Sequence, residues 1–414
     1  MHVKSYFITL TAILFSGSRS TIASCALVIS ILLLGLPTGT QARPYVPTTD
    51  DAVLERLPEK TDPAIADLKR LRRALSMQPN NVGLAVRFAR QSIEASRATG
   101  DPRFLGHAQA ALAPWWAAND APPEVVVLRA TIRQSLHDFD SALRDLDRVL
   151  TVGPRNGQAR LTRASVLTVV GRYDEAARDC AALAGLTLEI VVVTCQAQAA
   201  SVNGDADKAY ADLMQALERA RTLSPDLTAW VQTLAAEIAA RRGLYPQAEN
   251  HYRLALAADP KDAYLRGSYA DFLMDRGRPR EAAALAGSDL RNDALLLRVA
   301  LAETQISDPT KEEQRLAAQH GEDLAARFAA SRARGDVVHR REEARYALHL
   351  EHNPPRALAL ARANWKVQRE PADLRILAEA ARATGDAAAL ETVQAWRREH
   401  RFQDAALVSA LGGS

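Results

Sequence analysis

Aromatic residues are scarce in this sequence: Phe, Trp and Tyr together make up only 5% of its 414 residues. β-branched residues gather in a few places, and Ala, Leu and Arg dominate, a composition typical of stacked helices with small contacts between them. We therefore expect strands to be rare. Hydrophobic residues reach 48%, enough for a large buried core, although length alone does not separate two globular domains from one long array of repeats.

An excess of one charge is also missing. The 52 basic residues, of which only seven are lysines, face 49 acidic ones. The arginines are interleaved with acidic residues, as in Arg144–Asp145 and Arg341–Glu342–Glu343. A nucleic-acid-binding surface needs its basic residues gathered on one face without acidic neighbours. The arginines therefore indicate solvated helix faces with local ion pairs, and the sequence predicts no nucleic-acid partner.

Signatures of the common catalytic sites are absent. The sequence has no G-x-x-x-x-G-K-[ST] phosphate loop, no G-x-G-x-x-G after a strand, no H-E-x-x-H and no G-x-S-x-G. Phosphate cradles, zinc peptidase sites and the nucleophile elbow of hydrolases each need one of these motifs. We therefore expect a protein that is not an enzyme and holds no cofactor.

The first 42 residues contain no acidic residue and only two basic ones. Two apolar runs, 6–15 and 26–36, are followed by a stretch of small residues that ends at Ala42. This pattern predicts a secretory signal that is cleaved after Ala42, so that the mature chain is periplasmic or secreted. Residues 43–62 contain several prolines and threonines and indicate an extended linker.

Two alternatives for this segment stay open. Ile22–Cys25 resembles a bacterial lipobox, which would make Cys25 a lipidated N-terminus, although Arg19 interrupts the apolar run before it and a second apolar run follows. The other alternative is an uncleaved membrane anchor. In every case the rest of the chain lies outside the cytoplasm, and its only expected membrane contact is through this segment.

One phrase recurs along the chain: a helix, a turn residue, a few polar residues and an alanine that opens a second helix. The alanines lie 34, 33, 39 and 34 residues apart. A glycine at the turn lets the chain leave the first helix, and the small alanine lets the two helices approach closely. The instances are His137–Ala142, Gly171–Ala176, Gly204–Ala209, Gly243–Ala248 and Gly277–Ala282.

This period and phrase resemble the tetratricopeptide repeat, a helix-turn-helix unit. The best single match runs from Ala229 to Asp262. The resemblance covers about residues 63–400 and is strongest over 123–285. It implies an all-α fold, a right-handed superhelical solenoid of antiparallel helix pairs. The residues that carry the best match at the family's spacing are Gly243, Tyr245, Ala248, Tyr252, Ala255 and Pro260.

We divide the array into N-terminal repeats at 63–291 and divergent C-terminal repeats with a cap at 292–414. An unusually long helix from Thr310 to Arg334 raises the question of whether it breaks the solenoid, and Phe402–Leu411 is expected to cap the last apolar face. The other helices expected outside the strongest repeats are Ala64–Met77, Asn81–Thr99, Pro102–Leu112, Asp293–Ile306, Val338–Leu350, Pro355–Arg369, Ala372–Thr384 and Ala387–His400.

Cys180 and Cys195 lie on neighbouring antiparallel helices, at matching distances from a turn expected near residues 187–188. That placement brings them opposite each other, so in an oxidising compartment we expect a structural disulfide. A redox centre would favour an exposed pair at C-x-x-C spacing, which is absent. A free buried pair is the remaining alternative.

The helix expected at Val338–Leu350 is the best remaining candidate for chemistry. His339, Glu342, Tyr346 and His349 share one of its faces and could coordinate a metal or hold a charged ligand. The alternative is a polar, partly buried helix whose side chains bond to the neighbouring unit.

In the family that this chain resembles, the first helix of each unit lines the inner, concave surface, where peptides or helices bind. The resemblance projects Arg87, Arg90, Glu94 and Arg97 onto this surface from the first complete unit. Aromatic side chains mixed with charges of both signs suit a polypeptide. The residues expected to form the partner-binding groove are Trp230, Glu237, Arg241, Tyr264, Asp271, Asp275, His339, Glu342, Tyr346 and His349.

The sequence thus predicts a non-catalytic scaffold of the bacterial cell envelope that binds a protein or peptide in its groove. An accessory or regulatory subunit of an envelope enzyme or transporter is the first alternative. A metal-dependent enzyme centred on His339–His349 is the second.

Overall fold

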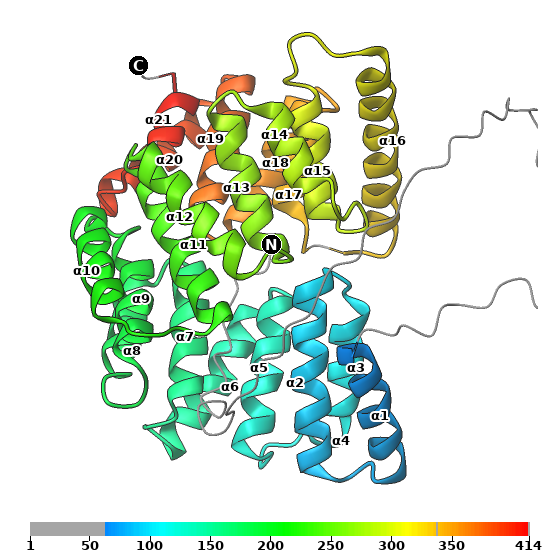
Figure 1. Cartoon of the computed structure of the whole chain (residues 1–414), viewed down its shortest axis with the longest axis vertical. Helices are drawn as coiled ribbons and strands as arrows, with labels where there is room; N and C mark the ends of the chain where they lie inside the picture. Colours follow the sequence, from blue (N-terminus) through cyan, green and yellow to red (C-terminus); the bar gives the residue numbers. More distant parts are fainter. Residues whose placement is uncertain (1–62, 337, 413–414) are drawn as a thin grey trace, which may run out of the picture. The chain divides into compact units, whose positions relative to one another are not determined.

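The computed structural model describes residues 63–336 and 338–412 (Figure 1). The expected export signal, with Cys25, and the expected linker lie outside the described residues. Within the described ranges all regular structure is helical and there is no strand, which confirms the predicted all-α fold. None of the helices in these ranges is both long enough and apolar enough to cross a membrane. The compact unit that holds the repeats begins at Leu68, inside helix α1 (Pro63–Met77).

The helices pack as successive pairs, each followed by the next pair along the chain. Three helices of the described ranges stand outside this scheme: α1 precedes the first pair, α4 (Ala113–Trp116) follows it, and α21 (Ala405–Ala410) follows the last pair. The pairs are α2 (Val82–Thr99) with α3 (Arg103–Ala111), α5 (Pro123–Ser135) with α6 (Phe139–Val152), α7 (Gly157–Val169) with α8 (Tyr173–Ala181), α9 (Glu189–Ala200) with α10 (Ala206–Arg219), α11 (Pro225–Arg241) with α12 (Tyr245–Ala258), α13 (Ala263–Asp275) with α14 (Pro279–Ala286), α15 (Asp293–Glu303) with α16 (Lys311–Ala333), α17 (Arg340–His349) with α18 (Pro354–Trp365), and α19 (Pro371–Thr384) with α20 (Ala387–Glu399).

The recurring phrase forms the turn within each pair. The four turn glycines all have positive φ, and His137, which replaces a glycine in the first instance, also has a φ of 60°. The alanine that follows each turn is at most 4% exposed. These alanines leave room for the first helix of the pair to approach the second closely.

Most of the expected helix limits lie within two residues of the observed ones. α16 begins with a capping box between Thr310 and Glu313 and ends at Ala333. These limits agree with the long helix predicted from 310 to 334. The helix predicted at Pro355–Arg369 is shorter than expected, since α18 ends at Trp365. The backbone N–H of Arg369 donates to the carbonyl of Val169 instead of continuing the helix.

A disulfide joins Cys180 of α8 to Cys195 of α9, as the helix positions predicted, with their Cα atoms 5.4 Å apart. Both cysteines lie in a core cluster that continues from α5 to α11. The bond therefore fastens the second helix of one pair to the first helix of the next, at an interface between repeats.

Candidate functional site

The first helices of the pairs form one continuous inner face. Each of them, from α2 through α5, α7, α9, α11, α13, α15 and α17 to α19, contacts the first helix of the next pair. Helices far apart in the chain also meet at this face: α2 contacts α13, and α11 contacts α21. The inner face therefore touches itself across the array, and parts of it are covered by the chain's own later helices.

The residues expected to line the groove on α11 are engaged inside the protein. Trp230 is 5% exposed and belongs to the core. The carboxylate of Glu237 accepts hydrogen bonds from the hydroxyls of Tyr264, at 2.6 Å, and Ser268, at 3.0 Å. Burial raises the pKa of Glu237, although these two hydrogen bonds and the charge of Arg241 oppose the rise. This carboxyl therefore has a raised proton affinity in the folded protein.

The two aspartates expected in the groove on α13 bind arginines of later repeats. Asp271 accepts from Arg298 of α15 at 2.9 Å and from Arg345 of α17 at 2.8 Å. Burial alone would raise the pKa of Asp271, but the two guanidinium groups outweigh it and hold the pKa well below its ordinary value. Asp275 forms a two-pronged bridge to Arg375 of α19, with both distances 2.7 Å. These carboxylates are therefore paired by the chain itself.

The four residues expected on one face of α17 have separate neighbours. Glu342 is buried beside Arg341, with 3.4 Å between carboxylate and guanidinium, while Tyr346 packs against Phe328, with ring centres 5.3 Å apart. His349 forms a hydrogen bond of 3.1 Å with Glu379, and His339 is partly buried just before the helix. In the described ranges no group of three or more His, Cys, Asp or Glu side chains is placed to hold a metal ion. Binding through these residues stays a prediction.

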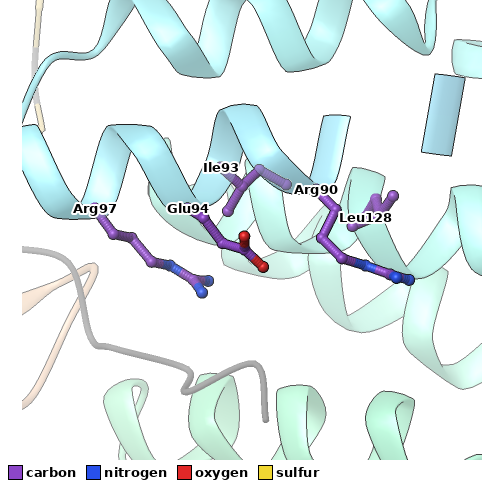
Figure 2. Close-up of a pocket in the computed structure, with 5 residues that line it drawn as sticks. All are labelled: Arg90, Ile93, Glu94, Arg97 and Leu128. Carbon is purple, nitrogen blue, oxygen red and sulfur yellow. The ribbon is translucent and has the colours of Figure 1, made fainter. Parts of the chain in front are cut away.

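A shallow pocket lies on the inner face at α2, and Figure 2 shows the five residues that line it. Arg90, Glu94 and Arg97 stand on successive turns of α2 and point to the same side of the helix (Figure 2). Ile93 of α2 and the buried Leu128 of α5 complete the lining. The resemblance to the repeat family projected the three charged residues onto this face. It gave no sign of the two apolar ones.

The electrostatics of this pocket favour a charged ligand. Burial raises the pKa of Glu94, with Arg97 and Arg90 opposing the rise and Asp226 of α11 adding to it. Two atoms of α2 in this region, Nε of Arg90 and Oε1 of Gln91, are buried without a hydrogen-bond partner among the described residues. Buried polar atoms usually have such partners. The pocket therefore presents charged side chains of both signs beside two apolar ones.

Comparison with known proteins agrees with this architecture. The sequence profile of the tetratricopeptide repeat matches residues 190–261, which span α9 to α12 and contain two of the five recurring turn phrases. No curated protein matches the sequence.

Solved structures of helical-repeat proteins resemble the chain only distantly. A tetratricopeptide repeat protein from Parabacteroides merdae is 15% identical, with 76% of this chain and 98% of that one covered and a TM-score of 0.35. A human IFIT1 dimer with m7Gppp-AAAA is 15% identical over 81% of this chain and 86% of that one, with a TM-score of 0.46. Yeast Tom70 is 14% identical over 80% and 89% of the two chains, with a TM-score of 0.35. At these values the matches give no guide to function.

Proposed function

Because the chain carries tetratricopeptide repeats, we propose that it is a non-catalytic protein-interaction scaffold of the bacterial cell envelope. Helical-repeat arrays present extended inner surfaces on which a polypeptide can lie. The described ranges are used almost entirely for helix pairs, and they hold no cluster suited to a metal ion. The fold suggests protein binding, and the proposal adds the compartment and the binding surface.

The observation that carries the proposal is the pocket at α2. Unlike Asp271 and Asp275, whose charges are neutralised by later repeats, Arg90 keeps a buried Nε without a partner. A partner polypeptide that offers a carboxylate to Arg90 and a basic group to Glu94 would match the two charges that line this pocket. The inner side of α2 is therefore the segment of the inner face on which we place the partner.

The compartment follows from two features. The expected secretory signal at 1–42 directs the chain out of the cytoplasm, and the disulfide between Cys180 and Cys195 suits an oxidising environment such as the periplasm. Fractionation of cells that express the full chain tests the location. Mass spectrometry of the exported protein should find an N-terminus at Arg43, and retention of the intact chain in the cytoplasm would contradict the proposal.

A site-specific cross-link in cells tests the binding surface. We would place a photoreactive amino acid at position 87, which is exposed one turn before Arg90 on α2. The matched control carries it at position 178, an exposed arginine on the second helix α8. We expect a defined adduct with one envelope protein from position 87 only, weakened at least fivefold by Arg90→Glu. Identical adducts from both positions, or an adduct that Arg90→Glu leaves intact, would rule out this surface.

A further inference from the structure

The last repeats of the chain dock onto repeats that lie far earlier in the sequence. The N–H of Arg369 donates to the carbonyl of Val169 at 2.7 Å, and the hydroxyl of Tyr173 donates to the carbonyl of Arg369 at 3.2 Å. His400 forms a hydrogen bond of 2.9 Å with Asn203. In an open solenoid each repeat contacts only its neighbours. These bonds therefore join the last repeats to the turns within two early pairs, α7 with α8 and α9 with α10.

One part of the closing contact is apolar. Tyr173 and Val202, from the early repeats, belong to the same buried cluster as Trp365 and Phe402 from the last ones. The ring of Tyr173 meets the edge of Trp396 with 6.0 Å between ring centres. This patch gives the contact a defined position, since aromatic rings pack in preferred geometries.

The other part is ionic and partly open to water. The two bridges Arg345–Asp271 and Arg375–Asp275 join the last repeats to α13, and the side chains of the second bridge are 35% and 31% exposed. Partly exposed ion pairs are weakened by salt. This ionic part of the attachment is thus of a kind that ionic conditions or a competing charged ligand can loosen.

Three polar atoms in this region are buried without a hydrogen-bond partner in the described part of the chain. They are Nε of Arg241 on α11, Oε1 of Gln368 before α19 and Nε2 of His400 after α20. Leaving such an atom unpaired is unfavourable.

We propose that helices α17–α21 act as a reversible lid over the part of the inner face formed by α7, α9, α11 and α13. The apolar patch around Tyr173 and Trp396 positions the lid, and the bridges to Asp271 and Asp275 hold it shut. Opening frees Asp275 for other ligands and leaves Asp271 bound to Arg298 of α15 alone. The regulatory role of the lid rests on the proposed function, that is, on the chain acting as a scaffold for a partner. Opening itself requires no partner and is measured without one.

Thiol labelling at the closing contact tests the lid. In the full chain with Cys25→Ser, the two remaining native cysteines form the disulfide, so a cysteine introduced by Val202→Cys is the reactive thiol. Val202 is 6% exposed and lies in the same buried cluster as Trp365 and Phe402 of the last repeats, so the proposal expects opening to uncover it. Ala248→Cys is the matched control, because Ala248 is fully buried inside one helix pair and reports unfolding of the repeats.

We expect the cysteine at 202 to react with a thiol reagent at least tenfold faster than the one at 248, and faster still in high salt. Asp275→Arg should accelerate labelling at 202 alone, because it repels Arg375. Asp140→Arg, the same charge change at an exposed site on α6, should not. Adding Arg375→Glu to Asp275→Arg should slow the labelling again.

Two results would overturn the lid. If position 202 reacts as slowly as position 248 at every salt concentration, the contact is a permanent part of the core. If Asp275→Arg accelerates both positions equally, the bridge stabilises the whole fold and does not act on a separate moving part. Neither labelling result depends on a binding partner. A negative labelling result therefore does not contradict the binding surface proposed at α2, and a negative cross-linking result at α2 does not contradict the lid.

Discussion

Trp396, in the last helix pair, packs against Gly171, the turn glycine of a pair near the start of the array. A Cβ atom at position 171 would lie 2.6 Å from Cη2 of the indole. Gly171 also has a φ of 80°, in the left-handed region that the turn requires. One glycine therefore serves its own repeat and, through the absence of a side chain, the docking of a helix from the far end of the chain.

Substitution of this glycine separates the two roles. Gly277, at the equivalent turn of α13 and α14, has a φ of 68°, but a Cβ there would meet no atom within 4 Å. Gly277→Ala should cost about 1 kcal/mol of unfolding free energy from backbone strain alone. Gly171→Ala should cost about 1–3 kcal/mol more, because Trp396 must also move. Urea unfolding of both variants measures the difference. Equal losses of unfolding free energy would show that Trp396 moves aside without a free-energy cost.

The disulfide should stabilise the junction of two repeats. Its cysteines are separated by 15 residues in sequence, and closing a loop of that length contributes about 3 kcal/mol in the chain-entropy treatment. Cys180→Ala with Cys195→Ala should therefore lower the thermal unfolding midpoint by several degrees. Reductant should lower the midpoint of the wild-type chain and leave that of the double variant unchanged. A double variant as stable as the oxidised wild type would contradict a structural role.

The repeat architecture could be predicted because its determinants are local. A turn residue followed five residues later by an alanine is a short-range pattern, and even His137, which breaks the glycine rule, takes the left-handed φ that its position in the phrase requires. The start of the long helix also has a local determinant, since Thr310 and Glu313 are only three residues apart and cap each other.

The closure of the array could not be predicted in this way. Arg345 reaches Asp271 across 74 residues, Arg375 reaches Asp275 across 100, and His400 reaches Asn203 across 197. No periodic pattern in the sequence links partners at such separations. The resemblance placed Asp271 and Asp275 on the inner face as open ligand contacts, because an open solenoid has no internal partner for them. Whether they bind a ligand once released stays a prediction.

The buried arginine of α5 should be more sensitive to substitution than the many exposed ones. Arg129 and Asp145 are each 3% exposed at the side chain and share two hydrogen bonds, of 2.6 and 2.8 Å. Asp145→Ala should cost about 3–5 kcal/mol of unfolding free energy, since it leaves the arginine buried without its counter-charge. Glu175→Ala, which breaks the exposed bridge to Arg172, should cost about 0–1 kcal/mol. Chemical denaturation measures the unfolding free energy of both variants. Similar losses would mean that water solvates the Arg129 guanidinium once Asp145 is removed.

Acid should weaken the fold through Glu379, which joins α19 to α17. Burial alone would raise the pKa of this carboxyl, but the hydrogen bond from His349 and the charge of Arg375 outweigh burial and lower the pKa from 4.5 to about 2. A lowered folded-state pKa means that the unfolded chain binds the proton more tightly. The contribution of Glu379 is therefore complete above pH 4.5 and is lost as the pH falls toward 2.

Glu379→Gln removes this titration. Between pH 6 and pH 3 the wild-type chain should lose about 2 kcal/mol more unfolding free energy than Glu379→Gln does, by the conversion from pKa to free energy. Glu391→Gln is the control, since Glu391 has the same side chain but is 66% exposed on α20. Its acid dependence should follow that of the wild type. If Glu379→Gln also follows the wild type, the contacts of Glu379 with His349 and Arg375 do not persist in solution.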